Sequence, residues 1–328
     1  MNNTLSRRGF IGVLFGSMAS CSPPTLFLNI NWKLLGQNIF PNTSNLTLEH
    51  LMDKYKIPRE LLTTTYEYNP DKPSRPKGNT LTVSSWNIAM NNAEKVYKAI
   101  ESNETLLNSD IIAMQEVFMK VDGSNVKLCL EEVADKLGMA GTYGVQYLPK
   151  DINSGNNAIG NLILSRYEID SSRIIRLPAG FDIEEHTSLI GTPLALSARV
   201  NIDGTPLDVY SVHLDSITSP YNRGVQMKSL LDDIEFDNPM LIAGDFNILW
   251  NWFEIADDYI RQCGFDDPFG LSEETTINNK EANMALKYGI TTGTLDRIFS
   301  RNVTVKDYII HDDIDISDHY PITVVYEV

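Results

Sequence analysis

The sequence of 328 residues contains few cysteines and few basic residues, and each shortage makes some classes of function less probable. Its three cysteines form no C-x-x-C pair and no cluster with histidine, so nothing in it indicates a zinc site. Lysine and arginine number 27 against 43 aspartates and glutamates, which gives a formal net charge of −16. That balance disfavours a protein that holds nucleic acid through a general basic surface. It does not exclude an enzyme that meets phosphate groups through a divalent metal ion, because the metal supplies positive charge.

Long apolar runs are also lacking. The apolar stretch Gly9–Ala19 is too short to span a bilayer as an ordinary transmembrane helix, and with the preceding Arg7-Arg8 it is typical of an export signal. Ser6–Phe10 resembles a twin-arginine signal, and Met18–Cys21 resembles a lipobox, in which the cysteine becomes the lipidated first residue. We therefore predict a signal over residues 1–21, lipidation of Cys21, and a bacterial protein that is exported to the periplasm or anchored to the membrane as a lipoprotein. The alternative is a cytoplasmic protein whose N-terminus happens to carry Arg-Arg.

The composition then changes twice along the chain. Residues 22–78 read as an N-terminal extension with a short helix at 46–57, followed by the linker YNPDKPSRPKGN. Residues 79–328 read as the main domain. Cys129 and Cys263 are predicted to be buried thiols, although they could pair in an oxidising compartment.

Within residues 79–328, apolar runs typical of strands alternate with amphipathic helices. Residues 93–108 and 219–236 have helical spacing, and Asp203-Gly204 between two β-rich runs is a strong hairpin signal. Strands outnumber helices, and helices lie between only some of them. The sequence therefore predicts an α/β protein in which antiparallel sheets pack together and helices cover the outside.

Polar residues end five of the predicted strands. An apolar strand fixes its backbone in the core, so a side chain at its end is held rigidly at the rim of a cleft. One such ending needs no explanation, but five that supply carboxylates, histidines and asparagines are not explained by solvation alone. The endings are Trp86-Asn87, Gln115-Glu116, Val212-His213-Leu214, Gly244-Asp245-Phe246-Asn247 and Ser317-Asp318-His319.

These residue types favour metal-assisted attack of water on a phosphate ester. Carboxylates such as Glu116 are hard oxygen ligands, which suit Mg²⁺ or Mn²⁺. A histidine held by a carboxylate can accept a proton from water or donate to a phosphoryl oxygen. Amides such as Asn87 and Asn247 orient ligands without adding negative charge that would repel the substrate.

Read in order, the motifs WN, QEV, VHL, GDFN, LDRIF and SDHYP resemble the endonuclease/exonuclease/phosphatase (DNase I-like) superfamily. Its members include DNase I-like nucleases, abasic-site endonucleases, neutral sphingomyelinases and inositol-phosphate phosphatases. The resemblance runs from about Leu81 to Val328, and GDFN followed by a late SDH is its specific pair of motifs. It implies a four-layered α/β/β/α sandwich of two packed, mainly antiparallel sheets, and hydrolysis of phosphate esters with Mg²⁺ or Mn²⁺.

The resemblance also implies roles for individual residues. Asp245 would orient or activate the attacking water, and Asn247 would steady the phosphate. His319 would act as general base or stabilise the phosphate, with Asp296 orienting it, while His213 would contact the scissile phosphate. The implied metal-binding residues are Asn87, Glu116 and Asp318.

Taken singly, these residues have simpler interpretations. Asn87 could cap a turn, His213 could be a satisfied core residue, and Asp296 could form a surface ion pair with Arg297. The joint pattern is what favours a site. Outside the motifs, three histidines are predicted to face solvent: His50, His186 and His311.

The substrate is left open among phosphate esters. The absence of a lysine or arginine cluster favours a lipid headgroup or another small phosphodiester, with a secreted DNase I-like endonuclease as the alternative. A catalytically silent binding module of the same fold is a further alternative, although none of the core residues is lost. The expected partners are a phosphoester substrate, either a membrane lipid or a nucleic acid, and the membrane itself through Cys21; no protein partner is inferred.

Overall fold

The structure is a computed structural model that describes most of the chain after residue 47. The described residues are 48–68, 78–122, 125–152, 157–180, 187–216, 218–248, 254–270, 274–278, 280–281 and 292–327. The predicted signal with Cys21, residues 22–47, the linker residues 69–77 and His186 lie outside them. Among the described helices, none is both long and apolar enough to cross a membrane.

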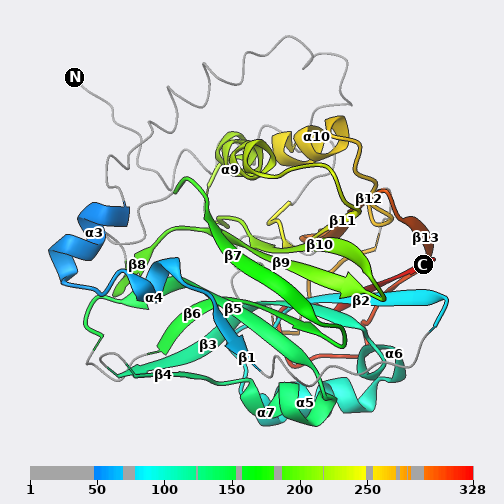
Figure 1. Cartoon of the computed structure of the whole chain (residues 1–328), viewed down its shortest axis with the longest axis horizontal. Coiled ribbons are helices and arrows are strands. Elements are labelled where there is room, and N and C mark those ends of the chain that lie inside the picture. Colours follow the sequence, from blue (N-terminus) through cyan, green and yellow to red (C-terminus); the bar gives the residue numbers. More distant parts are fainter. Residues whose placement is uncertain are drawn as a thin grey trace.

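Two β-sheets lie face to face at the centre of the molecule (Figure 1). The first sheet has nine strands and the second has five. In the first, the order is β1 (Tyr66–Tyr68), β5 (Ala140–Pro149), β6 (Asn157–Ser165), β3 (Ile111–Asp122), β2 (Thr80–Asn87), β14 (Ile322–Glu327) and β13 (Thr304–Ile310), with β4 (Asn125–Leu128) beside β3 and β8 (Leu189–Gly191) beside β5. In the second, it is β12 (Asp296–Arg301), β11 (Met240–Asp245), β10 (Thr205–His213), β9 (Leu194–Ile202) and β7 (Ile169–Arg176). The described pairings are antiparallel except β2 with β3 and β10 with β11, which are parallel.

Helices cover the outer faces of both sheets. Against the first sheet lie α5 (Ala93–Ser102), α6 (Glu104–Leu107) and α7 (Glu131–Leu137), at the bottom of Figure 1. Against the second lie α9 (Pro220–Asp233) and α10 (Ile255–Gln262), at the top. The predicted four-layered α/β/β/α sandwich is therefore confirmed.

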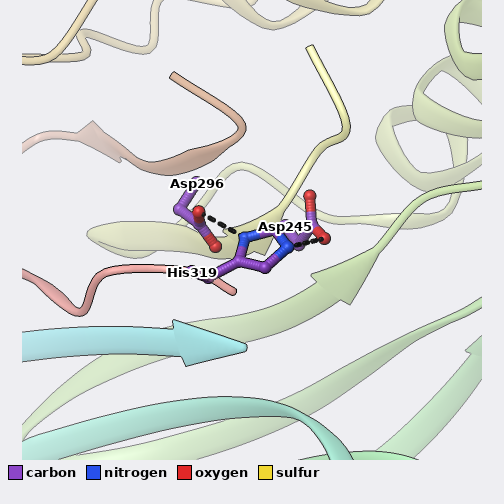
Figure 2. Close-up of side chains that lie close together, drawn as sticks. All are labelled: Asp245, Asp296 and His319. Atoms are coloured by element: carbon purple, nitrogen blue, oxygen red, sulfur yellow. Dashed lines mark hydrogen bonds and ion pairs between the residues drawn. The ribbon is translucent and has the colours of Figure 1, made fainter. Parts of the chain in front are cut away.

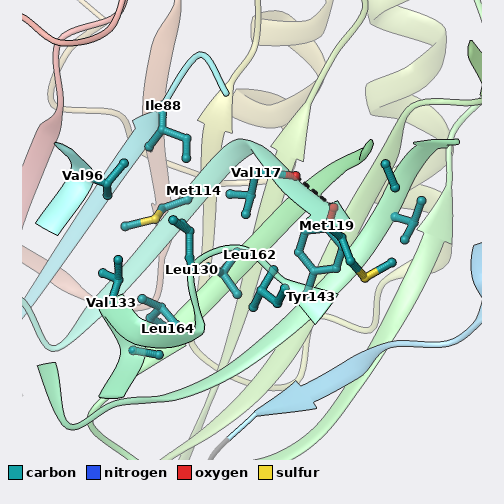
Figure 3. Close-up of a cluster of buried hydrophobic side chains, with 14 of the residues drawn as sticks. Ile88, Val96, Met114, Val117, Met119, Leu130, Val133, Tyr143, Leu162 and Leu164 are labelled. Atoms are coloured by element: carbon teal, nitrogen blue, oxygen red, sulfur yellow. Dashed lines mark hydrogen bonds between the residues drawn. The ribbon is translucent and has the colours of Figure 1, made fainter. Parts of the chain in front are cut away.

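Three apolar clusters hold the four layers together, and strand alternation distributes side chains among them. In β3, Ile111 and Ala113 face the other sheet, whereas Ile112 and Met114 face the helices. Figure 3 shows the outer cluster of the first sheet, where side chains of β3, β5 and β6 pack against α7. One polar atom is satisfied within it, because the Tyr143 hydroxyl donates to the carbonyl of Val117 at 2.9 Å. Because both faces of the central strands are buried, these strands read as nearly continuous apolar runs.

Local signals account for several element boundaries. The predicted hairpin joins β9 to β10, and Asp203 and Gly204 adopt φ values of 52° and 98°, which Gly and Asp tolerate. Ser219 caps α9 by accepting the N–H of Asn222. The single helix predicted over residues 93–108 is wrong, because the chain breaks into α5 and α6 at Asn103. That residue is extended, and its side chain accepts the N–H of Leu106 to begin the second helix.

Residues 48–68, within the predicted N-terminal extension, pack directly on the domain. They form α3 (Leu48–Tyr55), α4 (Glu60–Thr63) and β1, which pairs antiparallel with β5. The guanidinium of Arg176 in β7 donates to the carbonyls of Leu62, Val145 and Thr192, the last two at 2.6 and 3.1 Å. One buried cation therefore joins this segment to both sheets.

Cys129 and Cys263 are free thiols in the structure, each half-buried. Their pairing, which the sequence left open, is not seen.

The prediction that His311 faces solvent is wrong, whereas His50 is exposed. His311 begins the connection between β13 and β14 and is buried, with Nδ1 3.2 Å from Asn103 Nδ2 and Nε2 2.8 Å from Thr323 Oγ1. The Nδ2 nitrogen of Asn103 can only donate, so Nδ1 of His311 accepts and Nε2–H donates to Thr323. Burial lowers the pKa of His311, an effect that Asp313 and Asp312 partly oppose.

We expect His311 to make folding less favourable in acid. Its pKa is lower in the folded chain than in the unfolded chain, so the unfolded state binds more protons as the pH falls below about 6.5, the ordinary histidine value. The free-energy advantage of the natural chain over His311→Gln, measured by urea unfolding, should therefore shrink between pH 7.5 and pH 5.5. An advantage that stays constant over this range would contradict the assignment.

Candidate active site

The two parallel strand pairs place polar side chains at one end of the sandwich. In the first sheet, Asn87 at the end of β2 stands beside Gln115 of β3, and Glu116 follows. In the second, His213 ends β10 beside Asp245, which ends β11. The carboxyl ends of parallel neighbours lie at the same edge of a sheet, so strand ends distant in sequence meet there.

Antiparallel neighbours complete the set. Asp245 is also in register with Asp296, the first residue of β12. β14 runs antiparallel to β2, with Ile322 opposite Ser85, so His319 just before β14 lies at the end of β2. The Trp86 indole N–H donates to the carbonyl of His319 at 3.1 Å and fixes this approach.

Unusual backbone geometry turns two residues toward the site. Glu116 has φ 55° at a bulge, where the pairing of β3 with β6 shifts register between Met114 and Val117. Asn247 has φ 53°. Such conformations cost a non-glycine residue about 1–3 kcal/mol and gather at functional sites, where a bulge re-aims a side chain.

Gly244 allows β11 to approach β10 closely. Its φ is 147°, and a Cβ at this position would stand 1.9 Å from the carbonyl oxygen of Val212. No side chain fits there, so the glycine sets where the following Asp245 lies relative to His213.

His319 and Asp296 form a buried hydrogen-bonded pair (Figure 2). His319 Nδ1 donates to Asp296 Oδ2 at 2.8 Å, and the other ring nitrogen, Nε2, points toward Asp245 Oδ2 at 3.6 Å. Asp296 is fully buried, so its interpretation as a surface ion pair with Arg297 is wrong; Arg297 instead donates to Asp267 at 2.6 Å. Asp296 thus holds the imidazole with Nε2 directed at the carboxylate cluster.

Two carboxylates control the charge of His319. Burial opposes a positive imidazole, but Asp296 and Asp245 outweigh it and raise the pKa of His319 well above its ordinary value. Near neutral pH the pair is therefore an imidazolium beside a carboxylate. Two roles were predicted for His319, general base and stabiliser of a phosphate oxygen. A positively charged ring favours the second role.

A second group surrounds Asp245. His213 Nε2 lies 3.6 Å from Asp245 Oδ2 and 4.0 Å from Glu116 Oε1. The Asn87 amide donates to both carboxylates, at 3.1 Å to Asp245 and 3.3 Å to Glu116. Its own oxygen accepts the N–H of Ala89 at 3.0 Å, so Asn87 bridges the site rather than simply capping a turn.

The remaining predicted residues, Asn247 and Asp318, lie at the margins. Asn247 donates its backbone N–H to Asp245 Oδ1 at 2.8 Å, and its amide donates to the carbonyl of Leu214 at 2.8 Å. Asp318 is half-buried, and its carboxylate lies 3.5 Å from the Ser317 hydroxyl. That hydroxyl donates to the carbonyl of Asn87 at 2.7 Å, which joins Asp318 to the site through the backbone.

The donor set fits a hard divalent cation. Within the described part of the chain, Glu116, Asp245 and Asp296 form ion pairs with histidine and none with lysine or arginine. Ligand atoms of Asp245, Asp296 and His319 lie within 4.8 Å of one another, a spacing that could hold a metal ion. His319 Nδ1 and Asp296 are already bonded to each other, however, so the carboxylate oxygens of Glu116 and Asp245 suit Mg²⁺ or Mn²⁺ better.

Sequence reasoning missed a group of buried polar residues that support these side chains. Gln115 donates to the Ser211 hydroxyl at 3.0 Å, and Asn161 donates to the Ser211 carbonyl at 2.9 Å, which ties the sheets together beneath His213. Thr276 and Asn278, both fully buried, bond the segments that carry Asp296 and His319. For Gln115, Asn161 and Ser211 the local signal was a polar residue inside a strand, whereas Thr276 and Asn278 lie in no named strand and their partners are distant in sequence.

Two arginines and a glutamine near the motifs, left out of the predicted site, make supporting contacts. Arg166 donates to three backbone carbonyls, and Arg223 forms a buried ion pair with Glu254. Gln226 donates to Asp215 at 2.7 Å. None of these contacts reaches the carboxylate cluster.

Comparison with known proteins agrees with this arrangement. The profile of the Endonuclease/Exonuclease/phosphatase family matches residues 84–319. The chain belongs to this family. Hydrolysis is the general activity of the superfamily, which includes nucleases and phosphatases. No curated protein sequence matched the chain.

Solved structures show the same fold. An endonuclease/exonuclease/phosphatase from Beutenbergia cavernae has a TM-score of 0.59 at 18% identity, over 76% of this chain and 72% of that one. The human Nocturnin catalytic domain with bound sulfate has a TM-score of 0.56 at 18% identity, over 82% of this chain and 98% of that one. A mannosyl-6-phosphatase from Bacteroides thetaiotaomicron has a TM-score of 0.51 at 17% identity, over 74% and 98%.

The charge of His319 can be tested directly. Replacing Asp296 with Asn removes the nearest negative charge while keeping the shape, so the pKa of His319 should fall. An NMR pH titration of the ring protons measures this, with the exposed His50 as an internal reference that should not move. An unchanged His319 titration would show that Asp296 does not hold the charge.

Proposed function

We propose that this protein is a divalent-metal-dependent hydrolase of phosphate esters that acts by attack of water on phosphorus. The observation that carries the proposal is a cluster of carboxylates that faces two histidines, one of them held by a buried aspartate. A negatively charged substrate enters such a site only with a cation present. The imidazolium of His319 supplies one positive charge, and a bound Mg²⁺ or Mn²⁺ would supply the rest and polarise the phosphoryl oxygen.

Each residue then has a distinct task. Glu116 would hold the metal ion, with Asp318 nearby; Asn87 would join it through its amide oxygen, which would require the bond from the N–H of Ala89 to break. Asp245 would accept the proton of the attacking water at Oδ2, because Asn87 and the backbone N–H of Asn247 orient that carboxylate. His319 Nε2–H, 3.6 Å from Asp245, is directed where it can donate to a phosphoryl oxygen.

His213 and the Asn247 amide act beside this centre. His213 Nε2 lies between Glu116 and Asp245, so it would contact the phosphate from the second sheet. The Asn247 amide donates to Leu214 and steadies the turn after β11; binding phosphate would require that bond to break.

We infer that the substrate is a lipid headgroup or another small phosphodiester. The net charge of −16 supports this, because a long nucleic acid is held through many cationic contacts. Export through residues 1–21 and lipidation of Cys21 would bring the enzyme to a membrane surface, where such esters occur. A secreted nuclease of the same fold is the competing function.

Activity should depend on added metal. The purified protein in EDTA should not cleave bis-p-nitrophenyl phosphate, and Mg²⁺ or Mn²⁺ should restore turnover, because the carboxylates alone repel the substrate. Assays of the same preparation with sphingomyelin, plasmid DNA and RNA then show which class of substrate is cleaved fastest. Cleavage of plasmid DNA without any lipid activity would reverse the proposed order.

Removing the carboxylate that would hold the metal ion should strongly reduce turnover. We expect Glu116→Gln to lower kcat/KM with Mg²⁺ by about 100-fold or more, a loss of the size seen when one charge-stabilising group is removed from an active site. Glu132→Gln, at an exposed position of α7, is the matched control and should be fully active. Equal activity of both variants would refute the site, and no activity in the natural chain would favour the binding-module alternative.

A further inference from the structure

We propose that Thr276 is a positioning residue that holds Asp296 and His319 in register; the inference rests on the proposed function of that pair. Thr276 lies in the short segment 274–278, which joins no named strand, and its side chain is fully buried. No family motif and no apolar periodicity pointed to it.

The side chain of Thr276 binds the start of β12. Its hydroxyl oxygen accepts the backbone N–H of Leu295 at 2.9 Å and that of Asp296 at 3.2 Å. These donors are buried, so the hydroxyl satisfies two groups that water does not reach. It thereby fixes the backbone from which the Asp296 carboxylate projects.

The backbone of Thr276 binds both sides of the pair. Its N–H donates to the carbonyl of Gly293 at 3.0 Å, and its carbonyl accepts the N–H of Tyr320, the residue after His319, at 2.7 Å. One residue therefore contacts the chain that carries the aspartate and the chain that carries the histidine.

The residues that follow Thr276 extend the same link. Ile277 forms an isolated bridge with His319. Asn278 donates its backbone N–H to the carbonyl of Asp318 at 2.9 Å and its amide to that of Ser317 at 2.7 Å. Segment 274–278 is thus hydrogen-bonded to Ser317, Asp318 and Tyr320, on both sides of His319, as well as to the start of β12.

The hydroxyl acts on the pair through the backbone at the start of β12, because it accepts the N–H groups of Leu295 and Asp296 and no hydrogen bond among the described residues joins it to the carboxylate. Losing the hydroxyl would leave two buried N–H groups unpaired and allow the start of β12 to shift. A displacement of about 1 Å at a catalytic pair can cost up to about 100-fold in rate.

Three variants of the full chain separate positioning from bulk stability. Thr276→Val keeps the shape and removes the hydroxyl, and Thr276→Ser restores the hydroxyl without the methyl group. Thr142→Val is the matched control, because Thr142 is also fully buried but its hydroxyl has no hydrogen-bond partner among the described residues. Should Thr276→Val not fold, Thr276→Cys gives the same comparison with a weaker acceptor.

The first measurement is the NMR resonance of the hydrogen-bonded Nδ1 proton of His319, assigned by its loss in His319→Gln. We expect it to move upfield or broaden in Thr276→Val, and to stay in place in Thr276→Ser and Thr142→Val. This readout needs no turnover. It decides the inference even if the natural chain hydrolyses no phosphoester, an outcome that would refute only the proposed function.

The second measurement is steady-state hydrolysis of bis-p-nitrophenyl phosphate with Mg²⁺. Thr276→Val should lower kcat about 10- to 100-fold, the usual effect of losing a supporting partner, with KM nearly unchanged. Thr276→Ser should recover most of kcat. A Thr276→Val protein that unfolds more easily but keeps the resonance and kcat would overturn the inference and leave Thr276 a structural residue.

Discussion

The parallel pairing at the centre of each sheet is the constraint on which the site depends. β2 with β3 and β10 with β11 are the parallel pairs among mainly antiparallel strands, and each delivers side chains to the same end of the sandwich. A shift of one residue in either pairing would turn Asn87 or Asp245 to the opposite face of its sheet. Gly244 protects this register, because only glycine permits β11 to lie so close to Val212. The relative positions of the side chains in the site therefore depend on strand pairing in both sheets.

Charge is the second constraint. Glu116, Asp245 and Asp296 are gathered without a lysine or arginine partner in the described part of the chain, and the rings of His213 and His319 lie beside them. Asp296 and Asp245 raise the pKa of His319, since a positive ring is favoured among carboxylates. The same imbalance makes the site receptive to a hard cation. Structure and chemistry are thus coupled, because the feature that would bind metal also sets the protonation of the histidine.

Much of this arrangement was predictable because its signals are local. Apolar runs with polar ends located the strands that carry Asn87, Glu116, His213 and Asp245, and Asp203-Gly204 located a hairpin. What failed depends on contacts distant in sequence. The three-residue β1 is defined by its pairing with β5, and His311 is buried because Asn103 and Thr323 surround it.

For the site, the sequence predicted which residues take part but not how they are arranged in space. Order and spacing of the motifs brought the right residues together, but no local pattern shows that Asp296 is fully buried or that Glu116 sits at a bulge with positive φ. The contacts of Thr276 were likewise invisible, since its partners lie about 20 and 44 residues further along the chain. Supporting residues of this kind are of common types such as threonine and asparagine, and only the folded structure distinguishes them from other polar residues.

The short strands at the border of the first sheet have a consequence for aggregation. An open strand edge is a template on which another chain can add. The outer edge of β5 is covered at one end by β1 and at the other by β8, each only three residues long, and Arg176 secures the segment that carries β1. A domain cut at residue 79 would keep every residue of the candidate site and yet expose half of that edge. Residues 48–68 therefore cover a strand edge that would otherwise be open to pairing with another chain.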